Sequence, residues 1–189
     1  TVLQNETING IVSQNNTFST VWFRFFENVY KSIRGNTDIK LGGLLNINTT
    51  SASNSGSSQT DLISYTLPKN YLKNNGDALE VEAWGIYAAN GNNKTVTLNF
   101  GSQTILTTGA VAANSGSFII KATIIRTAAA TQEIISEIIS SNSSVSDSTT
   151  RTAGTQTLSD DLIIKCTATG SSSNDVTQYA LKIKLFPNS

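Results

Sequence analysis

The chain has 189 residues, of which only 14% are charged, and its formal net charge is zero; it contains no histidine and a single cysteine. These numbers exclude nucleophiles activated by histidine, histidine-based zinc or iron sites, and an internal disulfide. A neutral chain lacks the basic surface that binds nucleic acid, and no apolar run reaches the length of a membrane span. We therefore expect no nucleic-acid partner and no membrane insertion.

The N-terminal part of the sequence predicts a short arm followed by one amphipathic, aromatic helix. Residues 1–17 are polar with isolated apolar positions, which is typical of an extended arm. Apolar residues then recur at helical spacing, at Val21, Trp22, Phe25, Phe26, Val29, Tyr30 and Ile33. One helix cannot bury so wide a stripe alone. It packs either on its own domain or, as the polar flanking segments favour, on copies of the chain or a neighbouring protein.

Composition divides the chain into three segments. Residues 46–60 are almost entirely Ser, Asn, Thr and Gly, with little to bury, which predicts a flexible linker. We expect an N-terminal module for anchoring or oligomerisation over residues 1–45 and a main domain over residues 61–189.

The main domain shows the two-residue period of half-buried strands. Residues 79–83 alternate Leu, Val and Ala with Glu80 and Glu82, and the Asn-rich turn at 90–93 leads to a second alternating run. The predicted inward positions are Leu79, Val81, Ala83, Val96, Leu98, Phe100, Phe118, Ile120, Ala122, Ile124, Leu162, Ile164, Cys166, Ala168, Tyr179, Leu181, Ile183 and Leu185, with Lys182 and Lys184 outward. Short strands separated by Gly, Asn and Ser turns indicate a mainly β fold, an antiparallel sandwich or barrel.

Residues 132–140 are compatible with two structures. The spacing of Ile134, Ile135, Ile138 and Ile139 suits a helix, whereas β-branched residues throughout favour a strand. Because the segment lies between two strand-like runs, we predict a strand.

Few residues could take part in catalysis or in metal binding. Glu80 and Glu82 could serve as a glycosidase pair, but alternation predicts a solvated strand face. Asp160 and Asp161 could bind Ca²⁺ together with Asp175 or Asp147, although no spaced calcium motif is present. Cys166 falls on an apolar strand face and is interpreted as a buried thiol. We therefore expect no enzyme activity, no catalytic residues, no cofactor and no metal.

Trp84 and Tyr87 are the candidate contact residues of the main domain. Alternation places Trp84 on the same face as Glu80 and Glu82, where an indole could stack on a sugar or pack under another subunit. We favour the subunit contact. Tyr87 and Tyr179 offer further aromatic faces, and the Asn-rich loops near 89–93 and 141–157 offer polar groups to a ligand.

A series of short motifs resembles a recurrent domain of tailed-bacteriophage virion proteins. The motifs are Leu67-Pro68, Asn75 to Leu79, Ala83 to Gly85, Asn93 to Thr95, Phe100-Gly101, Thr108-Gly109 and Gly116 to Phe118, and the aromatic segment from Trp22 to Tyr30 is similar to one near the start of phage fibre-type proteins. The resemblance implies a jelly-roll β-sandwich, usually a homotrimer, on the outside of the phage particle. It transfers no catalytic residues.

The resemblance and the residues together lead to one main expectation and one alternative. The main expectation is a non-enzymatic virion structural protein, either a head fibre, a capsid decoration or a tail-fibre component. It would bind other virion proteins through its N-terminal arm and helix, and display the β-domain on the exterior of the particle. The alternative is a receptor-binding module that recognises host-surface glycans.

Overall fold

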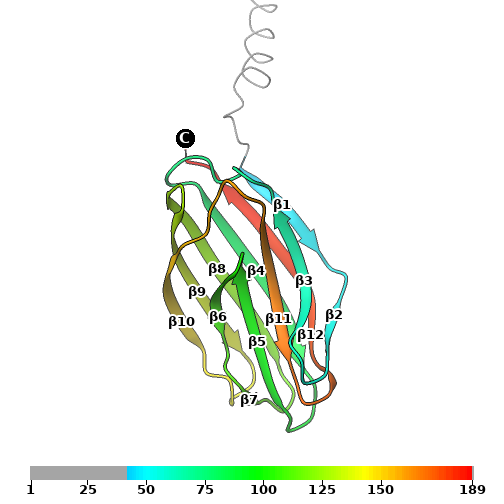
Figure 1. The fold of residues 1–189 in the computed structure, drawn as a ribbon. Helices are drawn as coiled ribbons and strands as arrows, with labels where there is room; N and C mark the ends of the chain where they lie inside the picture. The colour runs from blue at the N-terminus through cyan, green and yellow to red at the C-terminus, as the bar shows by residue number, and fades with distance from the viewer. Residues whose placement is uncertain (1–41, 189) are drawn as a thin grey trace, which may run out of the picture. The chain divides into compact units, whose positions relative to one another are not determined.

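Alternating sequence runs form long antiparallel strands in the computed structural model, which describes residues 42–188 (Figure 1). These residues contain twelve strands: β1 (Gly43–Asn48), β2 (Ala52–Ser55), β3 (Thr60–Leu67), β4 (Ala78–Tyr87), β5 (Asn93–Phe100), β6 (Gln103–Thr107), β7 (Val111–Ala112), β8 (Ser117–Ala128), β9 (Thr131–Ser140), β10 (Ser148–Gly154), β11 (Leu162–Thr169) and β12 (Ser173–Phe186). The prediction of a mainly β fold is confirmed. The predicted helix lies outside the described residues.

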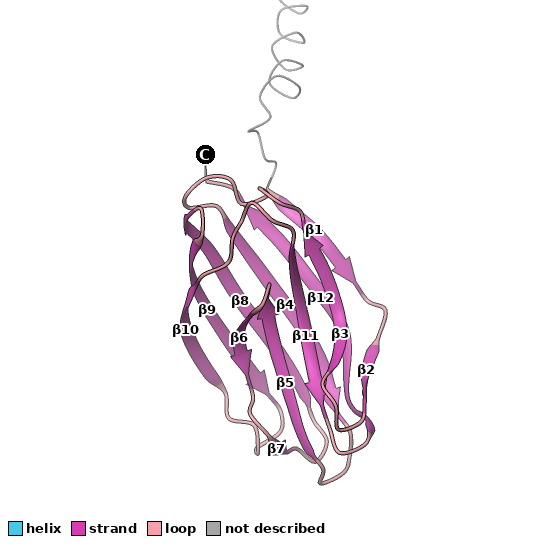
Figure 2. Ribbon diagram, in the orientation of Figure 1, coloured by secondary structure: helices cyan, strands magenta, loops and turns pink. Residues whose placement is uncertain are grey.

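The strands form two antiparallel sheets that lie one in front of the other (Figures 1 and 2). The larger sheet has the order β1-β12-β4-β8-β9-β10, and β2 also pairs with β12. The smaller sheet has the order β3-β11-β5-β6, with β7 paired to β5. No helix among residues 42–188 is long and apolar enough to cross a membrane.

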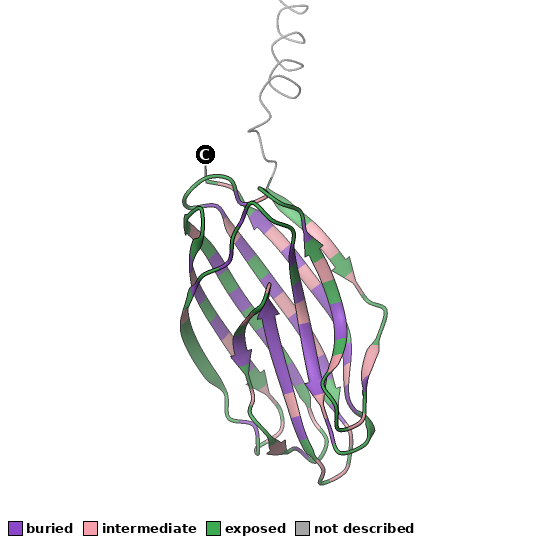
Figure 3. Cartoon of the chain, viewed as in Figure 1, coloured by how far each residue is buried: buried purple, intermediate pink, exposed green. Residues whose placement is uncertain are grey.

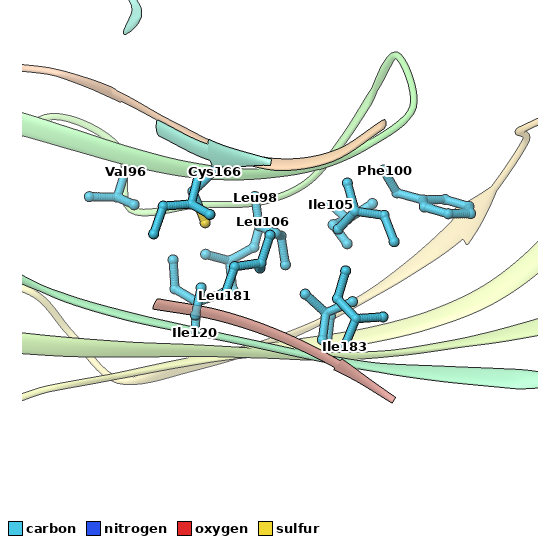
Figure 4. Packing of buried hydrophobic residues seen from close by; sticks show 14 of the residues in the cluster. Val96, Leu98, Phe100, Ile105, Leu106, Ile120, Cys166, Leu181 and Ile183 are labelled. Atoms are coloured by element: carbon cyan, nitrogen blue, oxygen red, sulfur yellow. The ribbon is translucent and has the colours of Figure 1, made fainter. Parts of the chain in front are cut away.

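The core lies between the two sheets. Val96, Leu98 and Phe100 point inward from the smaller sheet and meet Ile120, Leu181 and Ile183 from the larger one (Figure 4). Burial alternates along the strands, as a sheet with one face on a core requires (Figure 3). Of the predicted inward positions, all except Tyr179 are buried.

Residues 132–140 are part of strand β9, so the prediction of a strand is confirmed. Ile134 and Ile138 are buried, whereas Ile135 and Ile139 are exposed. Successive side chains of a strand point to opposite faces, so each Ile-Ile doublet places one residue on either side of the sheet. The apparent helical spacing reflects two such doublets.

The prediction of a flexible linker at residues 46–60 is wrong for about half of that segment. Strand β1 reaches Asn48, β2 covers Ala52–Ser55, and both pair with β12. Polar side chains stabilise the pairing of β2 with β12. Ser53 and Thr177 hydroxyls lie 2.8 Å apart across the strands, and buried Asn54 donates to the carbonyl of Ser172 at 2.9 Å. Hydrogen bonds replace the apolar contacts whose absence had suggested a loop.

Candidate binding surface

The outward side of the seven-stranded sheet, called here the outer face, gathers most of the exposed apolar surface. Ten large apolar side chains are exposed among the described residues, and all but Ile163 lie on this face. The members are Leu44, Ile47, Ile86, Ile119, Ile125, Ile135, Ile139, Tyr179 and Phe186. So large an unpartnered apolar set on one side of a sheet is typical of an interaction surface.

A row of alternating charges crosses the middle of the outer face. Strand register places Lys182 opposite Glu82, Glu82 opposite Lys121, and Lys121 opposite Glu137. We call these four residues the charged row. Lys182 forms an ion pair with Glu82, and the Lys121 ammonium lies 3.5 Å from a Glu137 carboxylate oxygen. The row therefore neutralises its own charges.

Two further ion pairs lie beside the charged row. Lys184 faces Glu80 at 3.9 Å, and Arg151 donates to Glu133 at 3.0 Å. Glu80 and Glu82, the carboxylates considered for glycoside hydrolysis, are thus each opposite a lysine. A hollow of about 540 Å³ lies over this region, lined by the charged row with Glu80, Ile135 and neighbouring backbone.

A second hollow, of about 440 Å³, lies at one side of the charged row, where Trp84, Ile119 and Tyr179 meet. Trp84 is half-buried on the outer face, as predicted, and the Lys182 ammonium lies 5.7 Å from the centre of its ring. This contact is a cation–π interaction, which helps to fix the indole in place. The hollow is therefore aromatic and apolar, with Glu82 as its charged neighbour.

Tyr179 reaches the outer face through a β-bulge. Alternation predicted an inward side chain, but Tyr179 is 43% exposed, and that prediction is wrong. The register of β12 shifts between Gln178, which pairs with Gly85, and Ala180, which pairs with Trp84. The extra residue breaks the two-residue period and turns Tyr179 outward.

Gly85 allows the bulged part of β12 to approach β4. A Cβ atom on Gly85 would lie 2.3 Å from the carbonyl oxygen of Thr177 and 2.6 Å from the ring of Phe118. Only glycine fits between them. The Ala-Trp-Gly motif thus places an aromatic side chain outward and leaves room for a close strand contact directly after it.

Tyr87 does not belong to the candidate surface. Its side chain is buried, and its ring packs 5.1 Å from the ring of Phe118. The predicted ligand or subunit contact at Tyr87 is therefore wrong. It is an inward position of β4, and β4 keeps its two-residue period up to this residue. The residues of the predicted helix, Val21, Trp22, Phe25, Phe26, Val29, Tyr30 and Ile33, lie outside the described residues.

The Asn-rich turn before β5 is occupied by internal hydrogen bonds. Lys94 is fully buried, and its ammonium donates to Asn90 Oδ1 at 2.7 Å and to the carbonyl oxygens of Asn90, Asn92 and Ala113. Burial lowers the pKa of Lys94, and the charge of Asp175 opposes that effect. The sequence does not indicate this burial, because a lysine after an Asn-rich turn suggests a solvated position.

Asp175 completes the same network from β12. Its buried carboxylate accepts hydrogen bonds from the side chains of Asn90 at 2.8 Å and Asn92 at 3.1 Å, and from the backbone of Ser172 at 2.8 Å. The asparagine amides that we had considered for a ligand are therefore used inside the protein. Asp175 is held in this network and not beside Asp160 and Asp161.

The remaining candidate residues are Asp160, Asp161 and Cys166. Asp161 accepts a hydrogen bond from the backbone of Lys69 at 2.7 Å, and a shallow hollow of about 510 Å³ lies over Asp160 and Asp161. No group of three or more potential metal-ligating side chains occurs in the described part of the chain. Cys166 is buried in the core, and burial raises the pKa of its thiol to about 12.

Comparison of the chain with protein-family models and with curated proteins finds no match.

Proposed function

We propose that the chain is a non-enzymatic structural protein of a tailed-bacteriophage virion, namely a head fibre, a capsid decoration or a tail-fibre component. Residues 1–45 would attach it to other virion proteins, and the β-domain would stand on the exterior of the particle. The motifs at Asn75 to Leu79 and Ala83 to Gly85 support the family, since they resemble those of phage virion domains.

The observation that carries the proposal is the outer face itself. An apolar surface with self-neutralised charges suits contact with protein, because covering it leaves no charge unpaired. The carboxylates that a glycosidase would need, Glu80 and Glu82, each face a lysine on β12. This arrangement supports a building unit over an enzyme.

We further propose that the two sheets have jelly-roll connectivity. Successive strands β3, β4 and β5 alternate between the smaller and the larger sheet, and so do β11 and β12. Such alternation between facing sheets is the feature that distinguishes double-sheet Greek-key folds from simple meanders. The hairpin of β9 and β10 extends the larger sheet beyond that pattern.

Deletion of residues 1–41 tests the attachment. The deletion ends before β1, which begins at Gly43, so every strand of the β-domain is kept. Supplied to a phage that lacks the gene, the shortened chain is expected to accumulate in the cell and to be absent from purified particles, whereas the full chain is incorporated. Equal amounts of both chains in particles would contradict attachment through the N-terminal part.

A second candidate function is recognition of host-surface glycans. The hollow at Trp84 and Tyr179 favours it, because aromatic side chains next to a carboxylate are suited to stacking and hydrogen bonding with a sugar. A glycan array probed with the full chain and with Trp84→Ala tests this candidate. Binding that requires Trp84 would support it, and an array without any signal for the full chain would count against it.

A further inference from the structure

We infer that the outer face is a self-association surface, and that its occupant is a second copy of this chain. The inference deepens the proposed structural role, on which it rests, by naming the partner and the residues that it covers. Three features of the face support it: two apolar patches, the self-complementary charged row, and the contrast with the smaller sheet.

The apolar residues form two patches on either side of the charged row. In the first patch, register places Trp84 beside Ile119 and Ile119 beside Ile139, while Ile86 and Tyr179 continue it. The second patch consists of Ile125 and Phe186, which flank Ala78, with Ile135 diagonal to Ile125; Leu44 and Ile47 lie on the edge strand β1. An interface needs an apolar centre that excludes water and polar groups that fix the orientation, and this face provides both.

The charged row is complementary to itself. Read across β12, β4, β8 and β9, its signs are plus, minus, plus and minus, at Lys182, Glu82, Lys121 and Glu137. A second copy whose row runs in reverse, or is displaced by one strand, places opposite charges against one another. The same pattern is no match for a partner with a single sign of charge, such as a nucleic acid or an anionic membrane.

Covering the charges of the face costs less than covering unpaired charges would. Each of its four ion pairs, Lys182–Glu82, Lys121–Glu137, Lys184–Glu80 and Arg151–Glu133, is formed within one copy. A buried charge is costly chiefly when it is left unpaired. Association therefore adds intermolecular contacts to groups that already have a partner.

The outward side of the smaller sheet has a different character. Thr97 and Asn99 occupy its centre, and Asn99 accepts a hydrogen bond from the Thr104 hydroxyl at 3.0 Å. Ile163 is the one large exposed apolar residue there among the described residues. This side has its own polar network and offers no apolar patch, so the surface to be covered lies on the larger sheet.

The mass of the full chain in solution tests the inference. We expect light scattering to give at least twice the 20.1 kDa monomer mass. Ile135→Asp should convert this assembly to monomer, because it places an unpaired carboxylate in the second patch. Ile163→Asp is the matched control, since Ile163 is 46% exposed and Ile135 is 51% exposed. The control should keep the wild-type mass.

A second variant distinguishes loss of the interface from misfolding. The double exchange Lys121→Glu/Glu137→Lys keeps the ion pair within one copy but changes the row to plus, minus, minus, plus. Like charges then face one another at every position of the reversed arrangement and at the central position of the displaced one, so we expect weaker association at an unchanged circular dichroism spectrum.

A monomeric wild-type chain would overturn the inference, and so would an assembly whose mass neither Ile135→Asp nor the double exchange reduces. Saturable glycan binding at the Trp84 hollow by a monomeric chain would assign the face to a sugar. None of these outcomes decides the virion role, which the deletion of residues 1–41 tests separately.

Discussion

Lys94 donates a hydrogen bond from its ammonium to the carbonyl oxygen of Ala113 at 2.7 Å, and this joins the Asn-rich turn to the segment that precedes β8. Oxygen atoms from Asn90 and Asn92 surround the same nitrogen. A charged group at this depth is stable only because each of its protons has an acceptor. The hydrogen bonds of the Lys94 ammonium therefore fix the conformation of the Asn-rich turn.

Replacement of Lys94 is expected to destabilise the fold. Lys94→Met removes the donor to several buried carbonyl groups. We expect the free energy of unfolding to fall by about 3 kcal/mol, which is typical when one partner of a buried charged pair is removed. Lys165→Met provides the control, because Lys165 pairs with the exposed carboxylate of Asp61 at 2.8 Å and should cost less than about 1 kcal/mol. Urea denaturation measures both. Equal losses in the two variants would contradict the role assigned to Lys94.

Asp175 is expected to make stability depend on acid pH. Burial raises the pKa of its carboxyl, but hydrogen bonds from Asn90, Ser172 and Asn92 outweigh that effect. The nearby Lys94 charge acts in the same direction as the hydrogen bonds, so the pKa lies below its ordinary value of 3.8. Such a group stabilises the native state above the pKa of the unfolded chain, and this contribution is lost as pH falls through the folded pKa.

The free energy of unfolding should therefore decrease below about pH 4. Asp175→Asn should be less stable than the wild type at neutral pH and should lose part of this acid dependence. Urea denaturation at several pH values measures the effect. Parallel pH profiles for the two proteins would contradict it.

Tyr87 offers a test of an unsatisfied polar group. Its hydroxyl is buried and has no hydrogen-bond partner among the described residues. Removal of that hydroxyl in Tyr87→Phe should leave stability unchanged or raise it by up to about 1 kcal/mol. Tyr87→Ala, which also removes the ring packed on Phe118, should lower it by about 3–5 kcal/mol. Thermal unfolding distinguishes the two, and a clear loss in Tyr87→Phe would show that the hydroxyl has a partner after all.

Cys166 should be unreactive in the folded protein. Its thiol is buried, and a pKa of about 12 leaves almost no thiolate at mildly alkaline pH. We expect a thiol reagent such as dithionitrobenzoate to label the native chain slowly and the urea-unfolded chain at once. Rapid stoichiometric labelling without denaturant would contradict the burial of this residue.

The sequence predicts the long strands well, because their two-residue period follows directly from a sheet with one face on a core. The inward residues of β4, β8 and β11 could be named in advance for that reason. The Ile-Ile doublets of β8 and β9 also indicate that apolar residues are exposed on the outer face. Adjacent strand residues point to opposite sides, so a doublet must expose one member.

Other features depend on contacts between distant parts of the chain. The bulge that exposes Tyr179 is visible only in the register of β12 against β4. Strand β2 is stabilised by polar contacts with β12, which a Ser-rich sequence does not indicate by itself. The buried Lys94 lies near the charge of Asp175, which is remote in sequence and lies on another strand. Alternation and composition describe single segments and therefore miss all three.

The proposed function places this chain on the outside of a phage particle. Immunogold electron microscopy of intact, purified particles tests it most directly, using an antibody raised against residues 42–189. We expect gold label on the exterior of particles that carry the gene product and none on particles from a deletion strain. Unlabelled particles, with the chain recovered only from the cell lysate, would contradict it.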